Sequence, residues 1–383
     1  MCSRANKKGT KQVHVLESAK PLHYRQYAKN TMKRLKFATL LSLFIVASCS
    51  TNPNYDPTKA HHTQDGFQNV DYDDDKGFLA FIKWRWQRLF QDIPGTDDYG
   101  FTIDTTHHEF VKNNTEKPSL TWIGHATFLI QFNGLNILTD PQFSERASPI
   151  SWAGPKRVVA PAMAIAQLPD IDAVIISHDH YDSLDESSVV ALSEHNSERQ
   201  LTFLVPLGTK AWFDDLDLDS ITVVELDWSQ SHEINGVRFT AEPSQHWGKR
   251  TLADAYERLW ASWVIEADDN RIFFAGDTGY SNHFNDIGEK YGEFDLALLP
   301  IGAYEPRWFM SAYHVNPDEA VKIHMDVRSK HSVGMHWGTF ILTDEPLDEP
   351  PSKLSEALRK YEIQESDFQV YQHGETRYLD DMF

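Results

Sequence analysis

Two histidines and an aspartate stand at alternate positions directly after an apolar run. Residues 177–182 read Ser-His-Asp-His-Tyr-Asp and follow the apolar residues 173–176. Side chains two residues apart in an extended chain point to the same side, so His178, His180 and Asp182 should converge at a strand end. Imidazole nitrogens and a carboxylate together suit zinc, with iron or manganese as poorer alternatives. The spacing predicts half of a metal site, and the alternative is a polar surface loop.

Three further segments each place one candidate ligand at the end of an apolar stretch, and these ligands are His246, Asp277 and His336. Each lies near a small residue, which lets the backbone approach a bound group closely. The chain has 18 histidines, so a single one carries little information. We expect ordinary surface or packed roles for ten of them: His61, His62, His107, His108, His195, His232, His283, His324, His331 and His373.

The order of these motifs resembles that of the metallo-β-lactamase superfamily, which is His-x-His-x-Asp, then His, then Gly-Asp, then His. The flanking residues resemble one branch, the phospholipases D that hydrolyse N-acyl-phosphatidylethanolamine. This second likeness is carried by segments such as Thr-Trp-Ile-Gly-His-Ala-Thr at 121–127 and Ile-Gly-Ala-Tyr-Glu-Pro-Arg-Trp-Phe-Met at 301–310. It extends from about residue 118 to the C-terminus.

The resemblance implies a site for two metal ions, with zinc as the expected metal. The first ion would be held by His178, His180 and His246. Asp277 would bridge to the second ion, which Asp182 and His336 would help to hold. Such a pair of ions activates a water for in-line attack on phosphorus and offsets charge on the phosphate oxygens. Asp182 and Asp277 are therefore expected to be catalytic as well as metal-binding.

Three other residues have supporting roles by the same resemblance. His314 would bind phosphate or protonate the leaving oxygen, unless it only makes a hydrogen bond at a helix start. Asp140 would orient a ligand histidine and His125 would orient another ligand, as carboxylates and other groups outside the ligand set commonly do. For Asp140 the alternative is an ordinary turn residue before Pro141.

Position 183 departs from the superfamily pattern, which continues His-x-His-x-Asp-His. This chain has Ser183 there. Hydroxyls are not among the usual zinc ligands in proteins. We therefore expect one tightly held ion and a second that is weakly bound or absent.

The remaining chain alternates short apolar runs with helical stretches. We expect strands at 119–123, 127–132, 135–139, 173–176, 201–205, 221–226, 237–241, 261–266, 271–275, 295–300, 332–335 and 368–371. We expect helices at 185–194, 208–213, 283–290, 316–325 and 351–360. The pattern alone indicates mixed α and β structure. The resemblance implies an αββα sandwich over residues 118–383.

The N-terminal region has the features of a secretion signal. A basic stretch at 32–36 precedes 11 apolar residues, too few for a membrane span but suited to a signal peptide. Val-Ala-Ser-Cys at 46–49 resembles a bacterial lipobox, so residues 1–48 would be removed and Cys49 lipidated. Ser50 after the cysteine resembles the pattern of lipoproteins that are sorted to the outer membrane. The protein would then be anchored in that membrane and face the periplasm. The alternatives are a plain secretory peptide or a short signal anchor, and Met32 is an alternative start.

Composition constrains the partners. The only cysteines are Cys2 and Cys49, so a disulfide framework is excluded and a metal in the main domain must use histidine and carboxylate. Removal of residues 1–48 takes away ten Lys/Arg and one Glu, which leaves 26 basic and 55 acidic residues and a formal charge of −29. So acidic a chain argues against nucleic acid as a partner. Two or more acyl chains at Cys49 would instead hold it on a membrane.

Between the signal and the main domain, residues 49–117 are expected to form a polar tether over 50–75 and a helix over 78–90. Phe78, Phe81, Ile82, Trp86 and Leu89 share one helical face. We favour packing of this face on the domain, and the alternative is a helix at a membrane interface.

The expected function is hydrolysis of a phosphodiester. The resemblance implies N-acyl-phosphatidylethanolamine as substrate, with an N-acylethanolamine and phosphatidic acid as products. The alternatives are hydrolysis of another phosphodiester or a lactone on the same fold. A different class of function is also open, namely a non-catalytic envelope lipoprotein that binds a ligand.

Overall fold

The computed structural model describes residues 51–72 and 76–379. The expected signal region and the lipidation residue Cys49 lie outside the described residues. The described residues belong to one compact unit, Thr51–Phe383.

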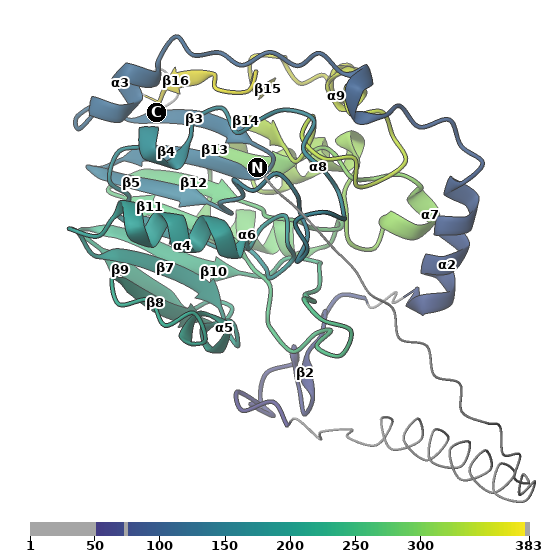
Figure 1. Cartoon of the computed structure of the whole chain (residues 1–383), viewed down its shortest axis with the longest axis horizontal. Coiled ribbons are helices and arrows are strands. Elements are labelled where there is room, and N and C mark those ends of the chain that lie inside the picture. The colour runs from purple at the N-terminus through teal and green to yellow at the C-terminus, as the bar shows by residue number, and fades with distance from the viewer. Residues whose placement is uncertain (1–50, 73–75, 380–383) are drawn as a thin grey trace, which may run out of the picture. The chain divides into compact units, whose positions relative to one another are not determined.

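Two seven-stranded sheets form the centre of this described part of the chain (Figure 1). In the first sheet the strand order is β16-β3-β4-β5-β6-β7-β8. Its strands are β3 (Ser119–Gly124), β4 (Thr127–Phe132), β5 (Leu135–Thr139), β6 (Ala173–Ile175), β7 (Leu201–Pro206), β8 (Ile221–Leu226) and β16 (Thr376–Tyr378).

In the second sheet the order is β15-β14-β13-β12-β11-β10-β9. Its strands are β9 (Ser231–Ile234), β10 (Val237–Glu242), β11 (Ser262–Ala267), β12 (Asn270–Phe274), β13 (Phe294–Pro300), β14 (Ser329–Met335) and β15 (Phe368–Val370). Every residue of β4 and of β13 is buried, because apolar side chains cover both faces of these central strands.

Helices cover the outer face of each sheet. One apolar cluster joins the first sheet to α4 (Glu186–His195) and α5 (Lys210–Asp214). A larger cluster fills the space between the sheets and reaches α6 (His283–Tyr291), α8 (Pro317–Asp326) and α9 (Pro350–Tyr361). The αββα sandwich is thereby confirmed.

Chain direction within the sheets determines where the loops meet. Strands β5 to β8 are parallel, as are β12 to β15. The carboxyl ends of parallel strands meet at one edge of a sheet, and ligands commonly bind beyond that edge. The segments after β5, β6, β10, β12 and β14 therefore gather at one end of the sandwich.

Most predicted elements are present within one to three residues of their expected ends. Sequence analysis missed β9 and β16, as well as the short helices α3 (His108–Asn113) and α7 (Arg307–Met310). Asn316 caps α8 by accepting from the Glu319 N–H at 2.9 Å, as its position before Pro317 indicates.

The expected tether is wrong for residues 51–72, which are folded onto the domain. They contain the two short strands β1 (His62–Thr63) and β2 (Gly66–Phe67), which pair in antiparallel fashion. Phe67 is buried, and its N–H donates to the Tyr256 carbonyl at 2.8 Å. Polar composition suggested a tether because it does not reveal specific hydrogen bonds to distant segments.

The expected packing of the helix over 78–90 is also wrong. Helix α2 (Gly77–Arg88) is present, but Trp84 is its buried residue. Its ring stacks on Phe309, and its Nε1 donates to Asp344 at 3.0 Å. The predicted apolar face points outward, with Trp86 64% and Leu89 75% exposed.

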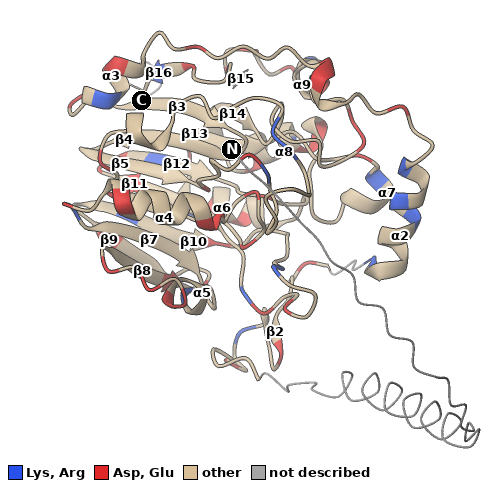
Figure 2. Ribbon diagram, in the orientation of Figure 1, with Lys and Arg blue, Asp and Glu red and all other residues tan. Residues whose placement is uncertain are grey.

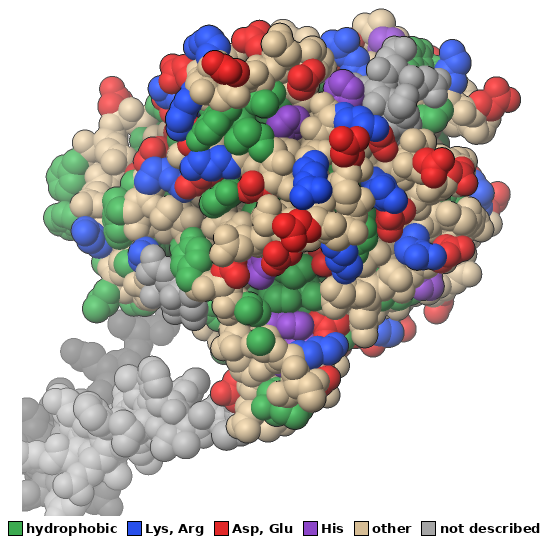
Figure 3. All heavy atoms as spheres, turned by 180° about the vertical axis from the view of Figure 1, so that it is seen from behind, with side chains coloured by type: hydrophobic (Ala, Val, Ile, Leu, Met, Phe, Trp, Pro, Cys, Tyr) green, Lys and Arg blue, Asp and Glu red, His purple; other side chains and the backbone are tan. Residues whose placement is uncertain are grey.

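The exposed face of α2 combines apolar and basic side chains. Figure 2 shows the Lys and Arg residues of α2, and Figure 3 shows apolar side chains gathered at the edge of the molecule where α2 lies. Phe78 and Leu79 extend this apolar surface, at 74% and 83% exposure. Among the described residues, no helix has the length and apolar content to cross a membrane.

Candidate metal centre

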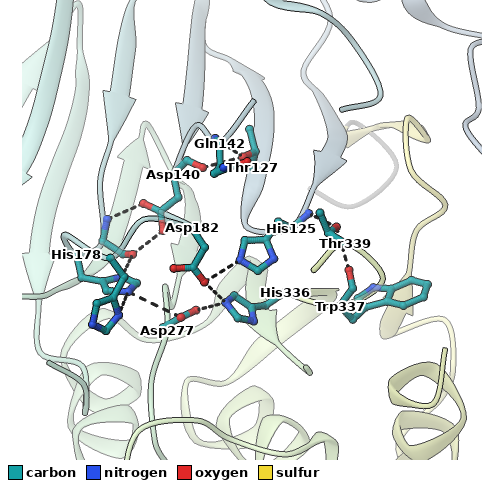
Figure 4. Close-up of polar contacts among 12 residues, drawn as sticks. His125, Thr127, Asp140, Gln142, His178, Asp182, Asp277, His336, Trp337 and Thr339 are labelled. Carbon is teal, nitrogen blue, oxygen red and sulfur yellow. Dashed lines mark hydrogen bonds and ion pairs between the residues drawn. The ribbon is translucent and has the colours of Figure 1, made fainter. Parts of the chain in front are cut away.

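The structure brings all six predicted metal ligands to one end of the sandwich, where the loops after four strands meet. Figure 4 shows four of them: His178, Asp182, Asp277 and His336. His178, His246, Asp277 and His336 are buried, while His180 and Asp182 are partly accessible. The centre is therefore polar, with four ligands fixed in the buried core and two that are partly accessible.

The first ligand group is a cluster of three ring nitrogens. His178 Nε2 lies 2.9 Å from His180 Nδ1, and His246 Nε2 lies 3.3 Å from the same His180 nitrogen. A single shared proton cannot pair with the lone pairs of three converging nitrogens, whereas a cation between them can accept all three lone pairs. The donor set therefore fits a metal such as zinc.

Hydrogen bonds behind these rings fix which nitrogen faces the cluster. His246 Nδ1 lies 2.9 Å from the Tyr313 carbonyl, an acceptor only, so Nδ1 carries the proton and Nε2 is free to bind. His178 Nδ1 lies 2.8 Å from Ser177 Oγ, and that hydroxyl donates to Asp140 Oδ2 at 2.5 Å. Asp140 thus acts on His178 through Ser177 rather than directly.

The second ligand group surrounds one carboxylate oxygen. Asp182 Oδ2 lies 3.1 Å from His125 Nε2 and 3.4 Å from His336 Nε2. His336 Nε2 also lies 3.1 Å from Asp277 Oδ1, while Asp277 Oδ2 is 3.8 Å from His178 Nε2 in the first group. Asp277 therefore stands between the two groups, where a bridging carboxylate is expected.

The charges in the centre call for a cation. Burial favours neutral carboxyl groups, but His125 and His336 outweigh it for Asp182, and its pKa is well below its usual value. Burial likewise opposes charge on His336, but Asp277 and Asp182 raise its pKa to about 10. The two buried carboxylates therefore favour a protonated imidazole beside them, and a divalent ion would compensate their negative charge in the same way.

The pKa of His178 shifts in the opposite direction to that of His336. Burial, together with the neighbouring His180, lowers the pKa of His178 to about 3, so the ring is neutral and its Nε2 is available as a ligand. Within the described residues, Asp277 Oδ1 and His336 Nε2 are buried without a hydrogen bond of good geometry. These orphaned atoms are what a metal centre without its ions would show.

His314 lies in the same centre, where the sequence placed it. One of its ring nitrogens lies within 4.8 Å of ligand atoms of His246 and Asp277. Burial lowers the pKa of His314 to about 4. Its backbone carbonyl accepts from Arg307 at 2.8 Å, which holds the residue ahead of α8.

The accessible side of the centre has an aromatic wall. The Trp247 ring lies 4.7 Å from the His180 ring, and Tyr256 and Tyr313 share a hydrogen bond of 3.0 Å between their hydroxyls. Arg250 does not face this wall. Its guanidinium donates to the carbonyls of Asp179 and Leu184, so it braces the ligand loop.

Sequence reasoning missed a second histidine cluster away from the centre. His61 Nε2 lies 2.7 Å and His62 Nε2 2.9 Å from the Asp227 carboxylate, and Lys59 Nζ is also 2.5 Å from it. This cluster has its own countercharge in Lys59, and it fastens residues 51–72 to the domain. The consecutive histidines at 61–62 could have indicated this cluster, but nothing in the sequence indicated that Asp227 is their partner.

Comparisons with known proteins agree with this geometry. The chain belongs to the beta-lactamase superfamily, whose domain profile matches residues 135–337. The solved isothiocyanate hydrolase from Delia radicum gut bacteria shares the fold, with a TM-score of 0.54 at 19% identity, over 68% of this chain and 98% of that one. Fold and site together define a metal-dependent hydrolase of the metallo-β-lactamase type.

Within this superfamily, the chain resembles the N-acyl-phosphatidylethanolamine-hydrolysing phospholipases D. It is 44% identical over 265 residues to phospholipase D 1 of this type from Caenorhabditis elegans, covering 67% of this chain and 74% of that protein. It is 37% identical to the mitochondrial enzyme of Saccharomyces cerevisiae, covering 61% of this chain and 50% of that protein.

Proposed function

We propose that the chain is a zinc-dependent phosphodiesterase of the phospholipase D type, which cleaves N-acyl-phosphatidylethanolamine to an N-acylethanolamine and phosphatidic acid. The observation that carries the proposal is Asp277, whose two oxygens face two separate groups of histidine and aspartate donors. The names of the worm and yeast relatives support this substrate class.

In this proposal His178, His180 and His246 hold one ion, and Asp182 and His336 share a second with Asp277. Bound metal would supply an activated water and offset charge on the phosphate oxygens. The chain's own residues do the positioning. The Asp140–Ser177 pair and the Tyr313 carbonyl keep Nε2 of His178 and His246 unprotonated toward the centre.

His314 is our candidate for the proton donor. Its ring lies 5.2 Å from the His246 ring and 5.9 Å from the His336 ring. From there it can contact a phosphate oxygen or protonate the leaving ethanolamine oxygen. The Trp247, Tyr256 and Tyr313 side chains offer an apolar wall for an acyl chain.

We further propose that the protein works on a bacterial membrane. Lipidation at Cys49 would anchor it in the envelope, at the outer membrane facing the periplasm. The exposed apolar face of α2, with the exposed Lys83 and Arg85 on the same helix, suits contact with lipid headgroups and acyl chains. An enzyme held there would reach its lipid substrate without extracting it into water.

Lipid analysis tests the substrate. The purified full chain with zinc should release N-acylethanolamine and phosphatidic acid from vesicles that contain N-acyl-phosphatidylethanolamine. A parallel assay with bis(p-nitrophenyl) phosphate and with lactones separates the alternatives. Turnover of only these other substrates would reassign the enzyme on the same fold, and no turnover by metal-loaded protein would favour a binding role.

A further inference from the structure

We infer that His125 is a ligand of the second metal ion and replaces the histidine that the superfamily pattern has at position 183. The inference rests on the metal centre of the proposed function, but it concerns a residue from outside the His-x-His-x-Asp segment. It changes the expectation that Ser183 leaves the second site weak, because an imidazole reaches that site from another part of the chain.

Distances support a shared cation. One donor atom from each of His125, Asp182 and His336 lies within 4.8 Å of the other two. His125 Nε2 lies 3.1 Å and His336 Nε2 lies 3.4 Å from Asp182 Oδ2. Ligands held about 2.0–2.2 Å from a tetrahedral zinc ion are about 3.3–3.6 Å apart, so these donors need little movement to surround one ion.

The backbone of His125 is built to present its ring. His125 follows β3 with a φ of 56°, a left-handed conformation that a glycine would adopt at lower cost. Such strain in a non-glycine residue persists only where the surroundings impose it, often at functional sites. His336, with a φ of 64°, is strained in the same way, so both rings of this group are held by unusual backbone.

Hydrogen bonds tie the two strained residues together. The His125 N–H donates to Thr339 Oγ1 at 3.0 Å, and the His125 carbonyl accepts from the His336 N–H at 3.1 Å. The Trp122 Nε1 donates to the same carbonyl at 2.9 Å. The two imidazole centroids are consequently held 4.0 Å apart on one side of Asp182.

The competing explanation is that His125 only orients Asp182 through a hydrogen bond. Its Nε2 lies within hydrogen-bond distance of the Asp182 carboxylate, and this distance fits both an orienting residue and a metal ligand. However, His336 Nε2 also lies 3.4 Å from the same Asp182 oxygen, and Asp277 Oδ1 lies 3.1 Å from that His336 nitrogen. Two imidazoles thus converge on one carboxylate with a second carboxylate beside them, a set of donors that suits zinc and that an orienting role does not require.

Metal binding without substrate tests the inference. The full-length protein in detergent is stripped with a chelator and titrated with Zn²⁺ against a chromophoric competitor. We expect two ions in the wild type and a second ion weakened by more than about a hundredfold in His125→Ala, since loss of an orienting group costs about 10–100-fold. His232→Ala, which changes a histidine of β9 outside both groups, should bind as the wild type does.

Two further variants separate a ligand from an orienting residue. His125→Gln keeps an N–H that can donate to Asp182 but removes the imidazole, so the second ion should be lost as in the alanine variant. Adding Ser183→His to His125→Ala places an imidazole at the superfamily position and should restore the second ion. Retention of both ions by His125→Gln with unchanged affinity would overturn the inference.

A crystal of the wild-type protein grown with zinc gives a test that needs no variant. His125 Nε2 should lie about 2.0–2.1 Å from the second ion. A second ion with His125 more than about 3 Å away, or a centre that takes only one ion, would overturn the inference. Either result is independent of lipid turnover, so failure of the proposed substrate would leave the assignment of His125 intact.

Discussion

At the scale of single residues, Asp277 joins two donor groups that are otherwise separate. Gly276 before it has a φ of 60°, and a Cβ there would come within 2.4 Å of the Ser177 Cβ. The glycine thus allows the Asp277 loop to pack directly against the residue that supports His178. This explains in physical terms why a glycine precedes Asp277.

Replacement of Asp277 is expected to abolish activity while leaving the fold intact. Asp277→Asn keeps the shape but removes the charge that faces both groups. We expect kcat/KM to fall by more than the roughly 10²–10³-fold that follows loss of one stabilising group at a reacting centre. Initial rates on vesicles, with circular dichroism as a check of folding, measure this. Full activity in Asp277→Asn would show that the bridging role is wrong.

Several of these residues were predictable from the sequence, and the reasons are local. Each candidate ligand followed an apolar strand, and parallel strands carry such ends to one edge. The sequence did not predict that His125 lies among the donors of the second group. Its proximity to Asp182 depends on a left-handed turn and on Thr339, which lies far along the chain.

At the scale of elements, the segment that follows the β1–β2 hairpin supports the loop that carries His246. Asn69 Nδ2 donates to the His246 carbonyl at 2.9 Å, and the side chain of Gln245 donates to the Tyr72 carbonyl at 2.7 Å. Residues that looked like a tether therefore brace a predicted ligand. Hydrogen bonds between segments more than 170 residues apart leave no periodic pattern in the sequence.

Removal of the Asp227 carboxylate should release this hairpin. Burial would raise the pKa of Asp227, but hydrogen bonds from His61 and Lys59 lower it below its usual value, so the group is charged and paired. Asp227→Ala leaves those partners without a countercharge and should cost about 3–5 kcal/mol of unfolding free energy. Urea unfolding and proteolysis within residues 51–72 measure this, with the exposed Asp269→Ala as control. Equal stability of the two variants would contradict the anchoring role.

Helix α2 should contribute to membrane binding. Leu79 and Trp86 are exposed on a helix whose basic residues lie nearby, while the buried Trp84 and the Arg88–Asp344 ion pair hold the helix to the domain. The pair Leu79→Glu and Trp86→Glu should weaken sedimentation with anionic vesicles several-fold without changing turnover of bis(p-nitrophenyl) phosphate. The matched control is Glu356→Gln on α9, a residue that is exposed away from α2. Unchanged vesicle binding would remove α2 from the interface.

At the scale of the whole molecule, burial keeps several histidines neutral, including His324 on α8. Burial lowers the pKa of His324 to about 4, and its Nδ1 lies 2.8 Å from Ser332 Oγ. The unfolded chain has a histidine pKa of about 6.5, so it binds protons that the folded state excludes. The stability from His324 is therefore complete above about pH 6.5 and is lost as the pH falls toward 4.

His324→Gln should reduce this acid sensitivity. Between about pH 6.5 and 4 the wild type should lose up to about 3 kcal/mol more than the variant, at about 1.36 kcal/mol per pKa unit. Chemical unfolding at a series of pH values measures the difference. Parallel pH profiles for the two proteins would show that His324 is not the source.

We propose that four separate strand ends form one metal centre that hydrolyses a phospholipid. The most direct test follows N-acylethanolamine release by the full chain before chelation, after chelation, and after zinc is returned, with His178→Ala in parallel. We predict release that is lost on chelation, restored by zinc, and absent in His178→Ala at every stage. Release that persists after complete metal removal, or that is undiminished in His178→Ala, would contradict the account.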